Sequence, residues 1–479
     1  MLYDLNFLSK GAMFPPKSEI RRLDAYRVNT MLLEDDAWSA LPEYKRRVMY
    51  ILSNFALESE NVYLFSANYW ADLVNKVQEL IYGDPPEMKL ENKEELILKI
   101  LEETDFVGKA KEGCSDFEAL GDWVTKIIET EDGKTSYINV DPATWFPVVS
   151  IENVKEIKLH VLAWIVNITD SQFELHVQIH EKGKFTNKAF SIKSFNADSY
   201  YVVQSTGQKI QCPLYEIGEE LRQSRTNFVL GEFETGLKDF AIVASANNAS
   251  SRKIYGTSDF DLITDSIMEY NVRQTLKDVV LDKHSAPKMQ GPPLAGDNDK
   301  GNYIEVQQGE SAPSYLVWDA SMQAVENTIN GLKDDISNLS GMGSLLSSKT
   351  FGESQGYDAL MIKLAPALMR SAGKKVVLEK HIKKLISLIA TKHGEDIKEK
   401  DITVMWHDGI PTTESVRADI AQKHLNTGWS KKRVLMQDYG FDEATAELII
   451  EEKRLETPAI ASFGFDPYEE NPKDSGDTE

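Results

Sequence analysis

Hydrophobic residues follow two different periods in the first half of the chain. At residues 66–82 they recur every three or four positions and predict a helix, which Gly83 and the two prolines that follow should end. Two more amphipathic segments, residues 93–103 and 115–129, predict further helices. From residue 173 to 180 apolar and polar residues alternate strictly, so we expect a strand with one face in contact with water.

The alternating segment has neighbours of the same kind. Strand-like runs occur at residues 157–168, 185–195 and 239–245. Together they predict a mostly antiparallel sheet over about residues 135–246. His176 and His180 fall on the predicted wet face, where about 13 Å of strand separates them and prevents them from sharing a metal ion.

Two long helices with an irregular segment between them are predicted next. The first covers residues 259–284, and a Pro/Gly/Asp-rich stretch with short strand-like pieces at 303–306 and 315–318 follows. The second begins with Asp319 as N-cap. Its apolar positions form a heptad seam made of Met322, Val325, Ile329, Leu332, Ile336 and Leu339. Periodicity alone leaves two interpretations open, a helix that faces the core of its own chain and a seam between subunits.

Residues 340–356 are too rich in Ser and Gly to hold a helix and too apolar for a plain linker, so we expect a presented loop. The next helix covers residues 357–393. Pro366 removes one backbone hydrogen bond from it and Gly373 weakens the following turn, which predicts a kink between them.

The last part of the chain has a strand and a helical region. The strand is expected at residues 402–406. Three short helices are then predicted at 412–426, 430–439 and 442–455, and an acidic, disordered tail begins at about residue 458.

Composition limits the possible functions. The 479 residues are 42% hydrophobic, which is enough for about three domains, and carry 76 acidic against 53 basic residues, a net charge of −23. This charge disfavours a tight nucleic-acid binder. Cys114 and Cys212 are too few and too far apart for a disulfide framework or a zinc site, so neither a metal nor a cofactor is expected. No run of about 18 apolar residues indicates a membrane span, and no membrane partner is expected.

Motifs for catalysis are weak. Residues 352–356 match the G-x-S-x-G pattern around Ser354, but the buried strand that an α/β-hydrolase elbow needs does not precede them. His407 and Asp408 lie in a turn without a second histidine at ligand spacing. The phosphate-binding loop of ATP-driven motors is missing from the sequence. We therefore expect no enzyme, and a serine hydrolase is the weaker alternative.

The order of these elements resembles that of the portal proteins of tailed bacteriophages. The resemblance spans nearly the whole chain and rests on five stretches: residues 68–86 with the Tyr-Gly-Asp-Pro-Pro turn, 255–287, 318–319, 352–360 and 406–411. No stretch is diagnostic alone, but their order and spacing together are specific.

The resemblance implies an α+β, ring-forming portal fold with named regions. These are a wing (1–255), a stem helix (256–284), a clip (285–318), a returning stem helix (319–339), a tunnel loop (340–356), a kinked wing helix and strand (357–409), a helical crown (410–457) and an acidic tail (458–479).

The resemblance also implies function and partners. Such a protein forms a homo-dodecamer at one capsid vertex of the virion, after synthesis in the cytoplasm of the host bacterium. Double-stranded DNA passes through the channel, and the expected partners are the terminase large subunit, a head-completion adaptor, and the major capsid and scaffold proteins. Another oligomeric virion protein of the tail or scaffold is the alternative.

Three groups of residues acquire roles on this hypothesis. The heptad seam would pack between subunits of the ring. The tunnel loop would approach DNA through Leu345, Leu346, Ser347, Ser348 and Lys349. The acidic residues Glu326, Asp334 and Asp335 would face the channel, where negative charge keeps DNA from sticking.

Overall fold

The chain folds into two compact units, Met1–Gly409 and Ile410–Glu479, in the computed structural model. The residues that the structure describes are 1–54, 62–90, 93–194, 200–202, 209–211, 213–285, 289–291, 303–305, 314–315, 322–346, 357–407, 414–441 and 443–456. The first unit combines helices with antiparallel sheets, and the described part of the second is helical. The expected α+β class is confirmed.

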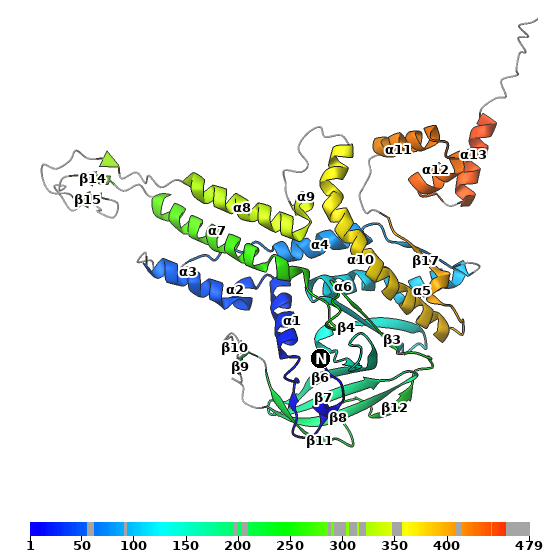
Figure 1. The fold of residues 1–479 in the computed structure, drawn as a ribbon, viewed down its shortest axis with the longest axis horizontal. Coiled ribbons are helices and arrows are strands. Elements are labelled where there is room, and N and C mark those ends of the chain that lie inside the picture. The colour runs from blue at the N-terminus through cyan, green and yellow to red at the C-terminus, as the bar shows by residue number, and fades with distance from the viewer. Residues whose placement is uncertain are drawn as a thin grey trace, which may run out of the picture. The chain divides into compact units, whose positions relative to one another are not determined.

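A seven-stranded antiparallel sheet forms the base of the first unit in Figure 1. Its order is β1-β11-β8-β7-β6-β5, and β12 also pairs with β8. The strands are β1 (Met13–Phe14), β5 (Val148–Val149), β6 (Ile157–Thr169), β7 (Gln172–His180), β8 (Lys184–Ser194), β11 (Tyr215–Glu220) and β12 (Gly231–Glu234). β9 (Tyr200–Val202) and β10 (Lys209–Gln211) form a separate pair. The predicted antiparallel sheet is confirmed.

The polar face of β7 is not wet, which corrects the expectation for this strand. His176 and His180 are both buried. The ring of His176 stacks on Phe228 at 4.4 Å, and the ring of His180 stacks on Phe185 at 5.2 Å. Polar residues alternate here because they bond to one another and to a covering loop, as when Ser224 donates to Glu174.

A three-stranded sheet of β13, β3 and β4 lies between the large sheet and the helices. The strands are β3 (Asp122–Glu129), β4 (Thr135–Val140) and β13 (Ile242–Ala246). The helix predicted over residues 115–129 is wrong. A helix ends at Ala119, Gly121 adopts a φ of 93°, and the chain continues as β3. A Cβ on Gly121 would lie 2.9 Å from the backbone of Thr257, so both φ and close packing require glycine here.

Ten helices are described in the first unit. They are α1 (Ile20–Leu33), α2 (Ala37–Ala40), α3 (Pro42–Asn54), α4 (Tyr69–Tyr82), α5 (Glu94–Thr104), α6 (Phe106–Ala119), α7 (Thr264–Ser285), α8 (Met322–Ser340), α9 (Gly343–Leu346) and α10 (Tyr357–Lys392). A short 3-10 turn, Asp259–Leu262, precedes α7. The main core contains Trp70, Trp123, Phe117 and Phe260. The three long helices, α7, α8 and α10, all contribute residues to it.

The long helices have a simple arrangement. α7 and α8 lie side by side and extend away from the rest of the unit (Figure 1). α10 contains Pro366 in its interior and changes direction in its first half, as the yellow ribbon in Figure 1 shows. These three helices confirm the helices predicted at residues 259–284, 319–339 and 357–393 apart from their ends, and Asp319 lies outside the described residues. The expectation that residues 340–356 hold no helix is wrong at Gly343–Leu346, where α9 forms.

Short strands join distant segments. Beyond α7 and α8, β14 (Met289–Gly291) pairs with β15 (Tyr303–Glu305) and β16 (Ser314–Tyr315). The strand predicted after α10 is confirmed as β17 (Ile402–Met405), and it pairs antiparallel with β2 (Glu87–Leu90). β17 therefore returns the chain to the segment that follows α4.

The second unit contains the three short helices predicted from the sequence. They are α11 (Glu414–Asn426), α12 (Lys431–Asp438) and α13 (Glu443–Glu456). Ser430 caps α12 by accepting a hydrogen bond from the backbone of Arg433, as its place before the helix predicted. The ring of His424 stacks on Trp429 at 4.2 Å and bonds to Asp438 of α12 at 2.8 Å.

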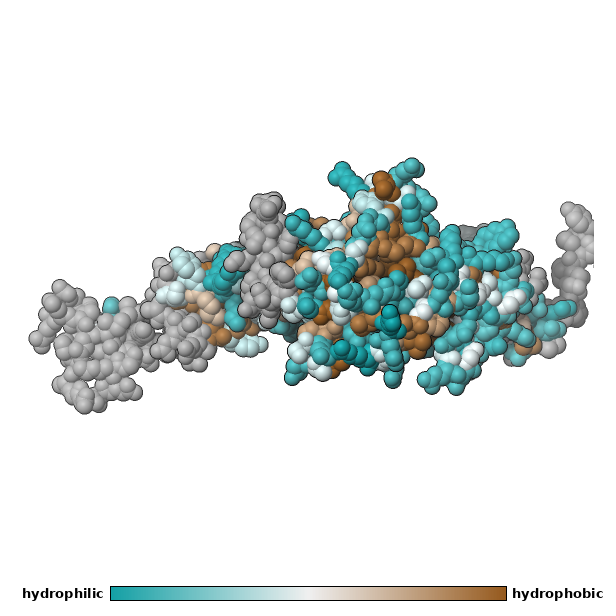
Figure 2. Space-filling view, turned by 90° about the horizontal axis from the view of Figure 1, so that it is seen from below, coloured by the Kyte–Doolittle hydropathy of each residue, from teal (hydrophilic) through white to brown (hydrophobic). Residues whose placement is uncertain are grey.

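The surface is mixed in character. In Figure 2 hydrophobic residues gather near the middle of the face seen from below, and hydrophilic residues surround them. Several large hydrophobic side chains of the first unit are exposed, among them Ile151 and Val229. Among the described residues, no helix has both the length and the apolar character needed to cross a membrane.

Candidate functional site

The heptad seam of α8 packs inside its own chain. Ile329 and Ile336 are buried in the main core, and Val325 and Leu332 pack against it. α7 supplies the facing side of this contact. Leu339, by contrast, is exposed. The middle of the seam is therefore covered by its own chain, without a second subunit. This agrees with the interpretation of α8 as a helix that faces the core of its own chain. The side chain of Met322 lies outside the described residues.

The predicted channel and loop residues have different surroundings. Glu326 is half-exposed, and its Oε1 lies 3.4 Å from Nζ of Lys277 on α7. Asp334 and Asp335 are exposed on α8. Leu345 packs against the main core from α9, which also contains Leu346. Ser347, Ser348, Lys349 and Ser354 lie outside the described residues.

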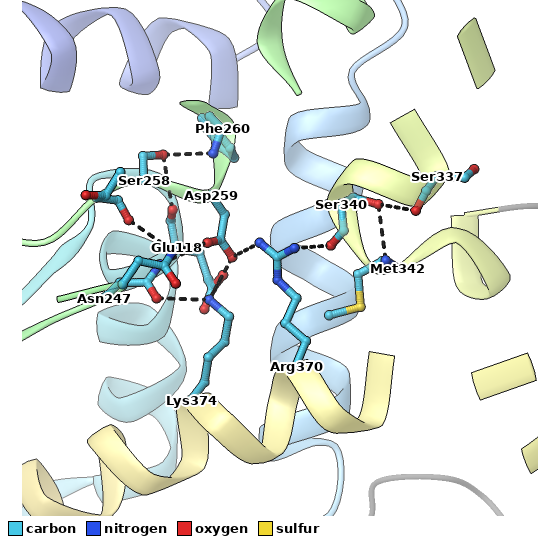
Figure 3. Close-up of polar contacts among 12 residues, drawn as sticks. Glu118, Asn247, Ser258, Asp259, Phe260, Ser337, Ser340, Met342, Arg370 and Lys374 are labelled. Atoms are coloured by element: carbon cyan, nitrogen blue, oxygen red, sulfur yellow. Dashed lines mark hydrogen bonds and ion pairs between the residues drawn. The ribbon is translucent and has the colours of Figure 1, made fainter. Parts of the chain in front are cut away.

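A cluster of buried charges lies where α6, the entry to α7, the end of α8 and α10 meet (Figure 3). Nζ of Lys374 on α10 donates to Glu118 of α6 at 2.6 Å and to Asp259 at 2.7 Å. It also bonds to Oδ1 of Asn247 at 3.2 Å. Arg370, one turn earlier on α10, reaches the same Asp259 carboxylate at 2.8 Å. We call these four charged residues the junction cluster.

Local backbone structure brings Asp259 to this place. Ser258 accepts a hydrogen bond from the backbone of Phe260 and so begins the turn before α7. Gly256 lies so close to Gly121 that a Cβ would approach its carbonyl oxygen to 1.8 Å. This contact between two glycines lets the chain enter α7 directly over α6, which places Asp259 beside Glu118.

The junction cluster also holds the end of α8. Arg370 donates a second hydrogen bond to the backbone carbonyl of Ser340, the last residue of α8. The Ser340 hydroxyl donates to Ser337 and accepts from the backbone of Met342, while Gly341 turns the chain with a φ of 66°. One guanidinium therefore connects the entry of α7, the exit of α8 and the middle of α10.

The two carboxylates of the cluster have pKa values shifted in opposite directions. Burial raises the pKa of Glu118 well above its usual value; the Lys374 charge opposes the increase and the Asp259 charge adds to it. Burial acts on Asp259 in the same sense, but a hydrogen bond with Glu118 and the charges of Lys374 and Arg370 together lower its pKa. The cluster thus favours a protonated Glu118 and an ionised Asp259 between two cations.

Sequence reasoning does not identify the members of the junction cluster. Adjacent lysines on an amphipathic helix are typical of solvated positions, yet Lys374 and Lys375 are both buried. Nζ of Lys375 donates to the backbone carbonyl of His407 at 2.7 Å. Two adjacent lysines within an otherwise apolar helix are a signal that could have indicated buried charges. The carboxylate partners of Lys374 could not be identified from the sequence, because they lie 256 and 115 positions away.

No set of side chains in the described part of the chain has the geometry of a catalytic site. Ser224, His176 and Glu174 meet, but Nε2 of His176 faces both the Ser224 hydroxyl, at 3.2 Å, and Glu174, at 3.1 Å. A triad needs the two contacts on opposite ring nitrogens. His407 Nδ1 lies 3.8 Å from Asp84. No group of three or more candidate metal ligands occurs among the described residues.

Comparison with known proteins identifies a family likeness over most of the chain. The model of a family described as phage portal protein, SPP1 Gp6-like, matches residues 64–459. No curated protein matches the chain. The matched range contains α4 to α13 and all four residues of the junction cluster.

Proposed function

Because the chain belongs to the SPP1 Gp6-like family of phage portal proteins, we propose that it forms a ring around a DNA channel at one vertex of a phage capsid. Proteins of this family are structural components of the virion that act in genome packaging and in connecting head to tail. The observation that carries the proposal is the family match over residues 64–459, which covers all elements from α4 to α13.

The regions of a portal subunit would map onto the chain as follows. α7 and α8 would form the stem, the strands β14 to β16 would belong to the clip, and the segment from α8 to α10 would carry the tunnel loop. The unit that begins at Ile410 would be the crown. Two long neighbouring helices joined through short strands support this mapping, since a stem and clip require such a pair.

The partners follow from this position in the virion. A homo-dodecamer would surround double-stranded DNA and contact the major capsid and scaffold proteins. The clip would bind the terminase large subunit during packaging and a head-completion adaptor afterwards. The ring would reach the capsid vertex after synthesis in the host cytoplasm.

An acidic channel wall would let DNA pass without holding it. Asp334 and Asp335 are exposed on α8, and Glu326 is half-exposed despite its contact with Lys277. Carboxylates repel phosphates within a distance of about 8–10 Å at physiological salt. Replacing Asp334 and Asp335 with lysine should slow packaging of DNA into capsids. An unchanged packaging rate would exclude these residues from the channel wall.

The tunnel loop would contact DNA through residues 345–349. Deletion of these five residues should impair DNA packaging or retention and leave the ring intact, because Leu345, the one of the five whose side chain is described, is only partly buried against the core. Lys349→Ala tests the single cation of the loop, and Lys158→Ala, an exposed lysine of β6, is the control. Normal packaging by the deletion variant would contradict the role of the loop.

Electron microscopy of the purified protein tests the function as a whole. Class averages should show a ring with a central channel. Oligomers without a channel would favour a different structural protein of the tail or scaffold. Hydrolytic activity that disappears in Ser354→Ala or His407→Ala would instead favour an enzyme.

A further inference from the structure

Large apolar side chains form a straight line on the exposed face of α10. Ile362, Met369 and Val376 have exposed fractions of 75%, 76% and 57% and are seven residues apart. Pro366 and Gly373 lie between them on the same face and are also exposed. Single exposed hydrophobic residues are ordinary, but an aligned group on one helix marks an interaction surface. We call these five residues the α10 stripe.

The stripe has the length and contour of a helix-packing surface. From Ile362 to Val376 it extends about 21 Å at 1.5 Å per residue. The seven-residue spacing is that of side chains that fit between those of a facing helix. No heavy atom lies within 4 Å of the position where a Cβ on Gly373 would be, so another backbone has room to approach closely there.

Charge around the stripe indicates what covers it. The most exposed charged side chains between residues 361 and 380 of α10 are those of Lys363 and Lys380. The acidic residue of this range, Glu379, is 32% exposed and forms an ion pair with Lys383. The whole chain carries a net charge of −23. A second copy of the chain carries more acidic than basic residues, so a neighbour can bring carboxylates close to the lysines beside the stripe.

We propose that the α10 stripe is a contact surface for a second copy of this chain, the neighbouring subunit of the ring. The inference rests on the proposed function, because it identifies the neighbour in that ring. A closed ring requires each subunit to present two different complementary surfaces, and the stripe supplies one of them. It provides the apolar area that the buried middle of the α8 seam no longer offers.

DNA is the other macromolecule that a cationic face could meet, and the composition of the stripe opposes it. Binding to phosphates requires several closely placed cations. Here the two lysines are separated by about 26 Å of helix, and large apolar residues occupy the space between them. A surface that is apolar in the middle and charged only at its edge is typical of the core and rim of a protein interface.

The test compares Met369→Asp with Ile151→Asp in the full chain. Ile151 has an exposed fraction of 77%, so both substitutions place a carboxylate at an equally exposed apolar position of the same unit. We expect Met369→Asp to reduce the ring fraction at least tenfold in native mass spectrometry, while Ile151→Asp retains the wild-type mass distribution. Val376→Asp should reproduce the loss independently.

Circular dichroism must show wild-type helix content in the variant used. If Met369→Asp fails this criterion, Val376→Asp decides. Intact rings in the decisive variant would overturn the inference, and so would equal losses in that variant and Ile151→Asp. Intact rings that fail only in DNA packaging would also overturn it and would place the stripe in the channel. Absence of rings in the wild type would contradict the proposed function itself.

Discussion

The inward face of α10 carries a few charged and polar side chains among apolar core residues, and its outward face carries large apolar side chains. On the inward face, Arg370 and Lys374 belong to the junction cluster, and His381 stacks on Trp123 at 3.8 Å. On the outward face, Met369 and the rest of the α10 stripe are exposed. A helix at the surface of an isolated globular protein usually presents polar side chains outward, so the outward face of α10 departs from this pattern.

The difference between the two faces separates two physical tasks. Buried ion pairs gain little net stability, but they require specific partners and therefore define where the helix lies against α6, α7 and α8. Exposed apolar residues have no such directionality and become favourable only when something covers them. The inward face thus accounts for the position of α10 in the subunit, and the outward face accounts for contacts beyond it.

Removing the central cation should have the largest effect. Lys374→Met leaves Glu118 and Asp259 buried with one cation fewer, so we expect a loss of about 3–5 kcal/mol in the free energy of unfolding. Urea unfolding followed by tryptophan fluorescence measures it. Lys363→Met, at an exposed position of the same helix, should change the value by less than about 0.5 kcal/mol. Similar losses for the two lysines would contradict the division between the faces.

The two carboxylates of the junction cluster should respond unequally. The lowered pKa of Asp259 means that the folded state favours its ionised form. The raised pKa of Glu118 means that the folded state favours its protonated form. Gln resembles protonated Glu, so Glu118→Gln should cost about 1 kcal/mol or less, and Asp259→Asn about 2–3 kcal/mol more. Equal unfolding free energies for the two variants would refute the assignment of protonation states.

His381 makes the inward face sensitive to acid. Burial and, to a smaller extent, the Lys384 charge together lower the pKa of His381 to about 3. Between about pH 6.5 and 3 the unfolded chain binds a proton at this residue and the folded chain does not, so stability falls as the pH falls. His381→Gln should flatten this dependence by about 1.4 kcal/mol per pH unit. Parallel stability profiles of the variant and wild type would exclude the effect.

Much of the fold was predictable because it is encoded locally. The period of apolar residues gave α8, Pro366 was expected inside the long helix, and Ser430 before α12 acts as the cap that its type suggested. These features depend on residues within one or two turns of each other. The family likeness was also predictable, because it rests on the order of such local elements.

The site was less predictable because its partners are distant in sequence. Glu118 and Lys374 are 256 positions apart, and each alone looks like a solvated charge on an amphipathic helix. His176 was placed on a wet face for the same reason, since alternation reports polarity and does not report what covers a polar face. Likewise, the α8 seam revealed an apolar face without revealing that α7 covers it.

The smallest expected effect comes from adding one methyl group to the outward face. Gly373→Ala should stabilise the dissociated subunit by about 0.5–1 kcal/mol, because the helix gains propensity and the new Cβ meets open space. If the α10 stripe packs against a neighbour, the same methyl group obstructs the approach at Gly373, and the ring should dissociate at lower salt or higher dilution than wild type. Thermal unfolding of the subunit and sedimentation of the ring measure the two effects separately. Opposite signs would show that this face is shaped for contact with a neighbour, whereas a stabilised subunit with an unchanged ring would place Gly373 outside the contact.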